Sequence, residues 1–335
     1  MEGQTNKRLA TLVGCNYVGT PYELRGCIND VDAVRDTLVA RFGFAPADVA
    51  VLTDVRGAEV LPTGANIRRA LADMVARAAP GDVLFFHYSG HGTLVPPQHG
   101  EGGAEKEAIV PSDFNLITDV DFRLLVDRVP PGASFTIVSD SCHSGGLIDQ
   151  EKEQIGPSVC FDSGAPPTRI ARFVPYVALL DHLSAISGMP SSIHIADHLV
   201  ALFGADASAK FHAHGRSGNG STLSTALAPA SAPTQPRPDE GILLSGCQTN
   251  ETSADVPSYE ASGGKACGAF SSAVQSVLAA HPAPMSNREL VAKARAVLNE
   301  VGFEQHPCLY CTDANAEAPF LSQGKEEAAV GAALL

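Results

Sequence analysis

His87-Tyr88-Ser89-Gly90-His91-Gly92 closes one apolar, β-rich stretch of this chain, and Asp140-Ser141-Cys142-His143-Ser144-Gly145-Gly146 closes another. The stretches that they follow, 83–86 and 135–138, are predicted to be buried strands. Glycines after each strand permit sharp turns and a close approach of the backbone to a ligand. Open α/β sheets bind their ligands at the carboxyl ends of the strands. A histidine at one such end and a cysteine at another therefore indicate a thiol protease dyad.

The rest of the chain alternates strand-like and helix-like segments. This alternation predicts an α/β fold with a mainly parallel central sheet, helices on both of its faces and a partly helical linker insertion. Strands are expected at 9–13, 49–53, 83–86, 135–139, 242–244 and 308–311. Helices are expected at 30–42, 66–78, 121–127, 177–183, 193–203, 269–280 and 287–300.

Composition divides the chain into four portions. Prolines interrupt it after about residue 155, and 217–238 is rich in Ser, Thr, Ala and Pro, as linkers are. We expect a large catalytic portion at 1–160, a linker at 161–240, a small portion at 241–325 and a frayed tail at 326–335.

Composition and charge also restrict the class of protein. The 335 residues are 44% hydrophobic and 18% charged, which suits a folded enzyme and excludes a disordered chain. The formal charge of -14 argues against nucleic acid or an anionic membrane as the main partner and favours a cationic substrate. The eight cysteines are scattered, which indicates reduced thiols. Because the apolar run at 9–13 is too short for a signal segment, we expect the cytoplasm, with the nucleus, an acidic compartment or extracellular release as alternatives. We also expect a monomer.

His91 and Cys142 suit complementary roles in catalysis. They are 51 residues apart, close to the upstream histidine spacing of caspase-type enzymes. A neighbouring imidazole favours the thiolate and then protonates the leaving amine. The backbone N–H groups of Gly92 and Cys142 are the candidates for an oxyanion hole. The alternative is that both side chains are structural, because free cysteines are often buried.

Other histidines and cysteines have simpler explanations. His87 lies within a predicted strand and fits a core position, and His143 would point away from Cys142, so each is at most a weak alternative base. Cys308 and Cys311 have the two-residue spacing of a zinc site, but with no second pair of this kind a half-buried strand is the better explanation.

Further runs identify a family. Together with the two runs above, they resemble the type II, plant-type metacaspases, which are cysteine peptidases of caspase-like fold: LRGCINDV at 24–31, PTGANI at 62–67, ITD at 117–119 and GILLSGCQ at 241–248. The resemblance is close over 8–160 and 241–323 and weak between them. It implies an endopeptidase that is made as a single-chain zymogen.

The resemblance also implies cleavage after arginine or lysine. Asp140 lies two residues before Cys142, where its carboxylate can pair with a substrate guanidinium. Asp30 matches the second acidic position of the family's substrate pocket, and Glu251 and Asp255 match acidic residues that complete it. The competing explanations are a helix N-cap for Asp30 and a solvated loop for the other two.

Most type II relatives require calcium, and here the expected ligands are altered. Lys106-Glu107 stands where the family has Asp-Glu, and Asp119-Val120-Asp121 stands where it has three aspartates. Lysine repels a dication and valine offers no oxygen. Asp119, Asp121 and Asp149 remain as vestigial positions. The pattern resembles the calcium-independent subgroup that is active at mildly acidic pH, so no cofactor is expected; a calcium-dependent metacaspase is the alternative.

Self-cleavage in the linker is a further implication. Ala171-Arg172-Phe173 resembles the subgroup's site, with Arg169, Lys210 and Arg216 as alternatives. A proline-bounded linker suits proteolysis, although Arg172 would also be explained as an ordinary linker charge. Cys27 matches a second family cysteine near the active site, but a buried core position is the better explanation for it.

Two other functions remain open from the sequence. An asparaginyl-endopeptidase relative would share the dyad, but the acidic residues Asp30 and Asp140 disfavour a pocket for neutral asparagine. A non-catalytic scaffold or regulator of the same fold is disfavoured because His91, Cys142 and their glycines are intact.

Overall fold

A seven-stranded sheet forms the centre of the molecule in the computed structural model, which describes residues 6–97, 105–142, 144–148, 152–156, 170–212, 241–248, 251–258 and 264–321. The strand order is β2-β1-β3-β7-β10-β13-β8. The first five strands are parallel, and the last two run antiparallel to their neighbours. The strands are β1 (Arg8–Gly14), β2 (Val49–Thr53), β3 (Val83–Ser89), β7 (Ser134–Asp140), β10 (Gly241–Ser245), β13 (Cys308–Tyr310) and β8 (Glu153–Ile155).

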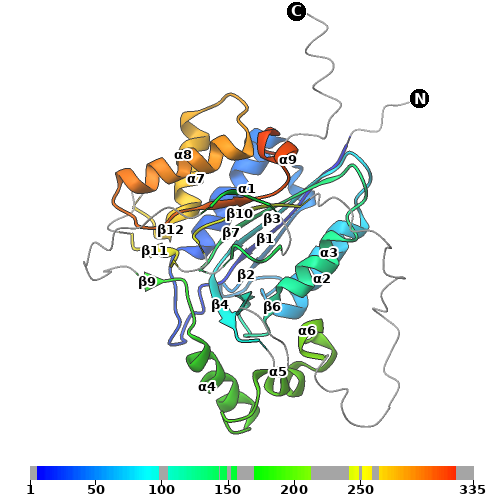
Figure 1. The fold of residues 1–335 in the computed structure, drawn as a ribbon, viewed down its shortest axis with the longest axis vertical. Coiled ribbons are helices and arrows are strands. Elements are labelled where there is room, and N and C mark those ends of the chain that lie inside the picture. The colour runs from blue at the N-terminus through cyan, green and yellow to red at the C-terminus, as the bar shows by residue number, and fades with distance from the viewer. Residues whose placement is uncertain are drawn as a thin grey trace, which may run out of the picture.

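Helices cover both faces of the sheet (Figure 1). One face carries α1 (Cys27–Phe42), α7 (Ala269–Ala280), α8 (Asn287–Glu300) and α9 (Asp313–Glu317), and the other carries α2 (Gly64–Ala76) and α3 (Asp119–Val126). An apolar cluster fills each interface. All seven residues of β3 are buried between them, which is why its sequence is a nearly continuous apolar run. The predicted caspase-like α/β class is confirmed.

Helix α1 brings an acidic residue to the carboxyl edge of the sheet. Its apolar face, Val31, Val34 and Leu38, packs on the sheet, and it ends at Gly43, whose φ of 69° suits a helix terminus. Asp30 lies inside the first turn. Gly26 takes the N-cap position, so capping does not explain Asp30.

Two small sheets lie beyond the carboxyl ends of the central strands. One is built from β4 (His91–Val95), β5 (Lys106–Val110) and β6 (Ile117–Thr118), and the other from β9 (Ile170–Ala171), β11 (Ala254–Val256) and β12 (Cys267–Gly268). His91 was expected in a loop and instead begins β4. Because β4 pairs antiparallel with β5, the histidine has a fixed backbone.

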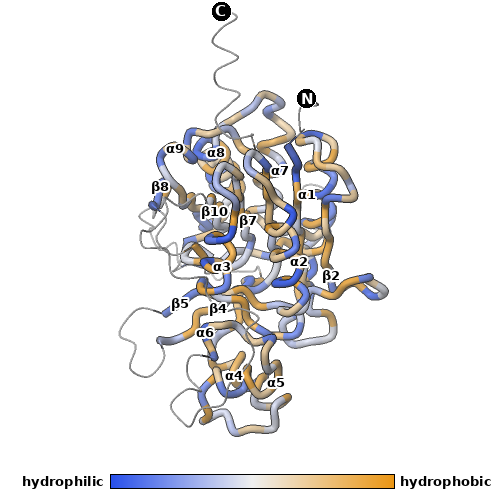
Figure 2. The backbone as a smooth tube through the Cα atoms, turned by 90° about the vertical axis from the view of Figure 1, so that its right-hand side faces the viewer, coloured by the Kyte–Doolittle hydropathy of each residue, from blue (hydrophilic) through white to orange (hydrophobic). Residues whose placement is uncertain are grey.

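The predicted linker is partly folded against the large portion. It contains α4 (Tyr176–Ser187), α5 (Ile195–Phe203) and α6 (Ala209–His212), which lie together at one end of the molecule beyond β4 and β5 (Figures 1 and 2). Short 3-10 helices cover Pro46–Asp48 and Gly204–Asp206. The apolar faces of α4 and α5 are buried in the same cluster as α2 and α3. Within the described ranges, no helix is both long and apolar enough to cross a membrane.

Candidate active site

Neighbouring strands bring the predicted nucleophile and base together. β3 and β7 pair in parallel register, with Ser89 opposite Asp140. His91 follows β3 at the start of β4, and Cys142 lies two residues beyond the end of β7. A Cβ atom on Gly92 would collide with the carbonyl oxygen of Cys142. Only glycine therefore lets these two segments approach so closely.

A backbone carbonyl orients the His91 ring. His91 is buried, and its Nε2 lies 2.7 Å from the carbonyl oxygen of Tyr22. A carbonyl oxygen only accepts hydrogen bonds, so Nε2 carries the hydrogen and Nδ1 is the basic nitrogen. Burial lowers the pKa of His91 to about 4, while the Tyr22 carbonyl acts in the opposite direction. The ring is therefore uncharged at neutral pH and able to accept a proton.

Cys142 lies under the loop that contains Ser253. Its side chain is fully buried, and the N–H of Ser253 donates to Sγ at 3.0 Å. Sγ in turn lies 3.5 Å from the carbonyl oxygen of Ser253, so the backbone of that residue fixes the position of the sulfur. The N–H groups of Cys142 and Gly92 both donate to the carbonyl oxygen of Arg172, at 3.2 and 3.0 Å. Two fixed amides on one carbonyl oxygen provide the geometry that stabilises an oxyanion.

The Arg172 side chain fills a closed acidic pocket. The residue is fully buried, and Nη2 lies 2.9 Å from Oδ2 of Asp30 and 2.9 Å from Oδ1 of Asp255. Nη1 donates to Oγ of Ser89 at 2.7 Å and lies 3.5 Å from the carboxylate of Asp140. The carbonyl oxygen of Asp140 accepts a further hydrogen bond from Nη1 at 3.1 Å. Three carboxylates thus surround one guanidinium, and only a cation can pair with them.

Backbone amides hold these carboxylates in position. The N–H of Gly268 donates to Asp30 at 2.9 Å, and the N–H of Ser271 donates to Asp140 at 2.7 Å. A Cβ atom on Gly268 would collide with both Asp140 and Arg172. Burial raises the pKa of Asp30 to about 6, and the charge of Arg172 acts against that rise. A cation in the pocket therefore favours the ionised form of Asp30.

The acidic residues of the small portion have different surroundings. Asp255 accepts the N–H groups of Arg25 and Gly26 at 3.0 and 3.1 Å, which fixes it beside the guanidinium. Glu251 contacts His306 instead. Its Oε1 lies 2.7 Å from Nδ1, and its Oε2 accepts the His306 N–H at 2.9 Å. These contacts hold Glu251 at His306, and its role in the acidic pocket stays a prediction.

Residues 170–174 cross the site, pairing first with β11 and then with Gly92. β9 pairs antiparallel with β11, and the N–H of Arg172 donates to the carbonyl of Ser253 at 2.8 Å. Phe173 forms a parallel bridge with Gly92, and the N–H of Val174 donates to the Gly92 carbonyl at 3.0 Å. The carbonyl of the Arg172–Phe173 peptide bond is thus fixed at the amide of the cysteine. A solvated linker charge does not describe Arg172.

The residues at the vestigial calcium positions make other contacts. The two carboxylate oxygens of Asp119 lie 3.7 Å from Nζ of Lys106 and 3.3 Å from Nζ of Lys210. Asp121 accepts the N–H of Thr118 at 2.8 Å in a capping box. Two ammonium groups on one carboxylate oppose a dication, so these residues do not fit a calcium ion. Asp149, together with His143, Arg169 and Arg216, lies outside the described residues.

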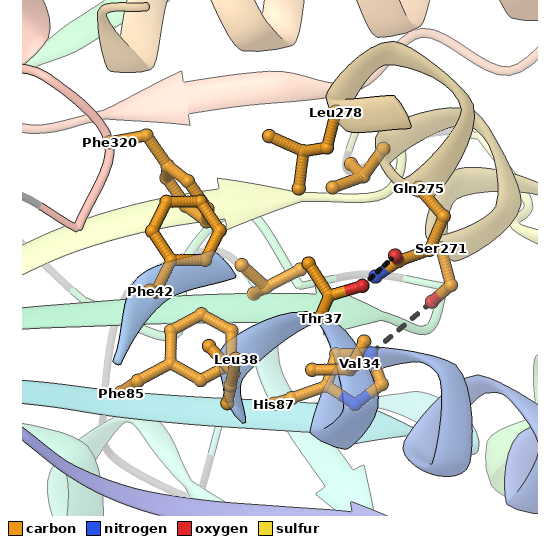
Figure 3. Close-up of a pocket in the computed structure, with 12 residues that line it drawn as sticks. Val34, Thr37, Leu38, Phe42, Phe85, His87, Ser271, Gln275, Leu278 and Phe320 are labelled. Carbon is orange, nitrogen blue, oxygen red and sulfur yellow. Dashed lines mark hydrogen bonds between the residues drawn. The ribbon is translucent and has the colours of Figure 1, made fainter. Parts of the chain in front are cut away.

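The remaining sequence candidates are structural. His87 is buried beneath the site in an apolar pocket between α1 and α7, with Nε2 3.2 Å from Oγ of Ser271 (Figure 3). Cys27 is fully buried, and burial raises the pKa of its thiol well above its usual value. Cys308 is also buried, and in the described part of the chain no three His, Cys, Asp or Glu side chains are placed to hold a metal ion.

Sequence comparison now identifies the family. The caspase domain family matches residues 7–318. The chain is 53% identical to Arabidopsis thaliana metacaspase-9 over 331 residues, covering 96% of this chain and 99% of that protein. The chain is a plant-type metacaspase. Arabidopsis metacaspase-6 is 41% identical, with 93% of this chain and 99% of that protein covered. The metacaspase is accordingly a cysteine-type peptidase, and its substrates are proteins.

A solved structure supports the fold independently. A crystal structure of a Geobacter sulfurreducens protein aligns with a TM-score of 0.58 over 95% of the metacaspase and all of its own chain, at 18% identity. At this identity the likeness shows the fold alone.

Sequence reasoning missed several residues that build this site. Tyr22 acts through a backbone carbonyl, which no side-chain pattern marks. Ser89 bridges the guanidinium and a carboxylate, and its place directly before the glycine of the first catalytic run was the available signal. Ser253 contributes its N–H, carbonyl and hydroxyl, and Gly268 contributes its N–H and its lack of a side chain. The roles of Ser253 and Gly268 can be recognised only in the folded structure.

Proposed function

We propose that this metacaspase cleaves proteins after arginine or lysine, with Cys142 as nucleophile and His91 as base and acid, and that it is made as a zymogen cut after Arg172. One observation carries the proposal. The guanidinium of Arg172 lies among three carboxylates while its carbonyl oxygen accepts two amide hydrogen bonds at the cysteine. The chain therefore occupies its own site in the manner of a substrate.

The contacts suggest how the peptide bond is cut. The Cys142 thiolate attacks the carbonyl carbon of Arg172, and the resulting oxyanion stays on the amides of Gly92 and Cys142. His91, oriented by the Tyr22 carbonyl, first takes the thiol proton of Cys142 on Nδ1 and then gives that proton to the departing amine of Phe173. Water then hydrolyses the thioester and regenerates the thiol.

Charge in the pocket supports specificity for basic residues. Asp30 and Asp255 each contact Nη2 at 2.9 Å, so a guanidinium forms charge-assisted hydrogen bonds to both. A neutral side chain would leave the buried carboxylates unpaired, and loss of one partner of a buried ion pair costs about 3–5 kcal/mol. Lysine supplies the charge without the planar fork, so we expect it to be accepted less well.

Regulation without calcium is part of the proposal. The two lysines on Asp119 support it, because they already neutralise the carboxylate that a calcium ion would need. We place the enzyme with the calcium-independent, mildly acidic subgroup and expect a monomer in the cytoplasm that requires no cofactor and binds neither membranes nor nucleic acid.

Two assays test this function. A fluorogenic peptide with arginine before the cleaved bond should be hydrolysed by the activated enzyme, whereas its glutamine counterpart and the Cys142→Ala variant should give no signal. Equal signals from wild type and Cys142→Ala would overturn the assignment.

Self-cleavage is tested on the chain itself. Arg172→Ala should remain full-length, Arg172→Lys should be cut more slowly, and Arg169→Ala is the matched control that should be cut normally. Unchanged processing of Arg172→Ala would show that another bond is the activation site.

A further inference from the structure

The two sides of the Arg172–Phe173 bond are anchored separately on the same folded chain. On the amino side, β9 is paired with β11, and the guanidinium is held by Asp30 and Asp255. None of these contacts passes through the Arg172–Phe173 bond. Cutting the bond therefore leaves the arginine in its pocket.

The carboxyl side is held by residues directly next to the bond. Val174 is fully buried, its N–H donates to Gly92 at 3.0 Å, and its carbonyl accepts the hydroxyl of Thr93 at 2.8 Å. Helix α4 begins two residues later and buries Leu179 and Leu183 completely. Val174 is thus fixed by backbone hydrogen bonds and by its burial in the core.

Helix α6 and the turn before it extend this attachment. The hydroxyl of Ser208 lies 2.9 Å from that of Thr118, and Lys210 pairs with Asp119 at 3.3 Å. The carbonyl of Asp206 accepts a hydrogen bond from Asn115 at 2.6 Å. After cleavage, these contacts would keep the new amino terminus at Phe173 from leaving.

We propose that the Arg172–Phe173 bond is cut reversibly, because the anchored amino group of Phe173 competes with water for the acyl group on Cys142. The metacaspase would then ligate its own chain as well as cut it. This inference rests on the proposed function, since it requires an acyl-enzyme to form between Cys142 and Arg172.

The ligation step is the reverse of acylation. The neutral amine of Phe173 attacks the thioester carbon, the new C–N bond forms, and the C–S bond breaks. The amine proton passes through His91 to the departing thiolate of Cys142. A chain that water has already cut first re-forms the thioester: the Cys142 thiol attacks the carboxyl carbon of Arg172, the C–S bond forms, and a water molecule leaves. No oxidant, reductant or further reactant is needed, and the chain returns to its uncut form.

Anchoring changes the balance between hydrolysis and ligation. Cleavage of a free peptide is favoured by the separation of its two products, whereas here both ends stay in place. An amine held against an acyl group behaves as a reactant at very high effective concentration, about 10⁵ M or more in well-oriented cases. The bond is therefore expected to pass between cut and uncut states, and the pocket becomes available only when residues 170–172 leave it.

Oxygen isotope labelling tests the proposal on the full chain. Purified uncut enzyme is incubated in H₂¹⁸O at a series of pH values from about 5.5 to about 8, because the proposed enzyme is active at mildly acidic pH whereas an ordinary α-amino group of pKa 7.7–8.0 is about half neutral near pH 8. After acid quenching, a digestion that spares arginine yields the peptide that spans residues 172 and 173. We expect ¹⁸O on the Arg172 carbonyl of the uncut chain, because only hydrolysis followed by ligation places it there. Cys142→Ala should acquire none.

Paired variants test the anchor. Val174→Asp should lower the ratio of labelled uncut chain to cut chain by about tenfold, because it removes the buried contact that holds the amine. Val177→Asp is the matched control, since Val177 is 68% exposed on the same segment, and it should leave the ratio unchanged. Thr93→Val, which removes only one hydrogen bond, gives a milder test should Val174→Asp misfold.

The possible outcomes are distinct. Cut chain that accumulates ¹⁸O while uncut chain stays unlabelled would overturn reversible cleavage and leave the proposed function intact. A chain that is neither cut nor labelled while it still hydrolyses a basic peptide would refute self-cleavage at Arg172, and the inference with it.

Discussion

The backbone N–H of Cys142 donates to the carbonyl oxygen of Arg172 at 3.2 Å, so the nucleophile's own amide holds the bond that the nucleophile is placed to attack. Gly92 supplies the second amide at 3.0 Å. Both donors are fixed by the central sheet and by β4, and neither needs to move when negative charge develops on the oxygen. The Arg172 carbonyl therefore lies where the proposed cleavage requires it, and the Arg172 side chain fills the pocket that another substrate would need.

The acidic pocket should discriminate by charge. Asp255→Asn removes one of the two carboxylates that contact Nη2 of the arginine, and the amide oxygen can accept only one of the two N–H groups that held the carboxylate, because they donate to different oxygens. We expect kcat/KM for an arginine peptide to fall about a hundredfold or more, as for loss of a buried charge partner. Asp32→Asn is the control, because Asp32 is exposed on α1 and should have no effect. Equal kinetics for the two variants would mean that Asp255 does not bind substrate.

Gly92 should be required for turnover more than for binding. A methyl group on it would collide with the carbonyl of Cys142 and displace the amide that contacts the substrate oxygen. We expect Gly92→Ala to lower kcat by about 10²–10³, the range for loss of one oxyanion donor, while KM changes little. Steady-state kinetics on the activated enzyme distinguish this result from a loss of substrate binding, which would instead raise KM.

His87 should make the uncut chain less stable in acid. Burial lowers its pKa to about 4, with Asp140 acting to raise it and Arg172 to lower it. Since the unfolded chain has a histidine pKa near 6.5, the unfolded state binds the extra proton first as pH falls. The folded state therefore loses stability between about pH 6.5 and 4, by up to about 3 kcal/mol.

Chemical denaturation isolates the contribution of His87. In a Cys142→Ala background, which keeps the chain uncut, His87→Gln should flatten the fall in unfolding free energy between pH 6.5 and 4. His91 and Asp30 titrate in both proteins, so their effects cancel in the comparison. His281→Gln, at an exposed position, should keep the full slope. A slope that His87→Gln leaves unchanged would show that His87 stays neutral in both states.

The sequence specified the central architecture because buried parallel strands and helices with one apolar face leave clear patterns. β3 and β7 were recognisable as short apolar runs, and the residues that follow them gave the positions of His91 and Cys142. β8 and β9 were not predicted. They are three and two residues long and are strands only because β13 and β11 pair with them. Short strands of this kind depend on tertiary contacts that no local pattern encodes.

The candidate site was predictable where a side chain carries the chemistry. Asp30, Asp140 and Asp255 converge on Arg172, as the family resemblance implied. Glu251 precedes β11 by three residues and contacts His306, whereas the pairing of β11 with β9 and β12 brings Asp255 to the guanidinium. The carbonyl of Tyr22 left no signal, since every residue has one.

Removal of calcium should leave activity unchanged. The charge of Asp119 is already balanced by Lys106 and Lys210, and Asp121 caps α3, so neither side chain is available as a ligand without breaking an existing contact. We expect millimolar EDTA to alter neither self-cleavage nor hydrolysis of an arginine peptide, and added calcium to give no activation. The double variant Lys106→Ala, Lys210→Ala provides a sharper comparison, because it frees the Asp119 carboxylate. Strong activation of the wild-type enzyme by calcium would contradict this prediction. It would mean that the ion displaces both lysines from Asp119.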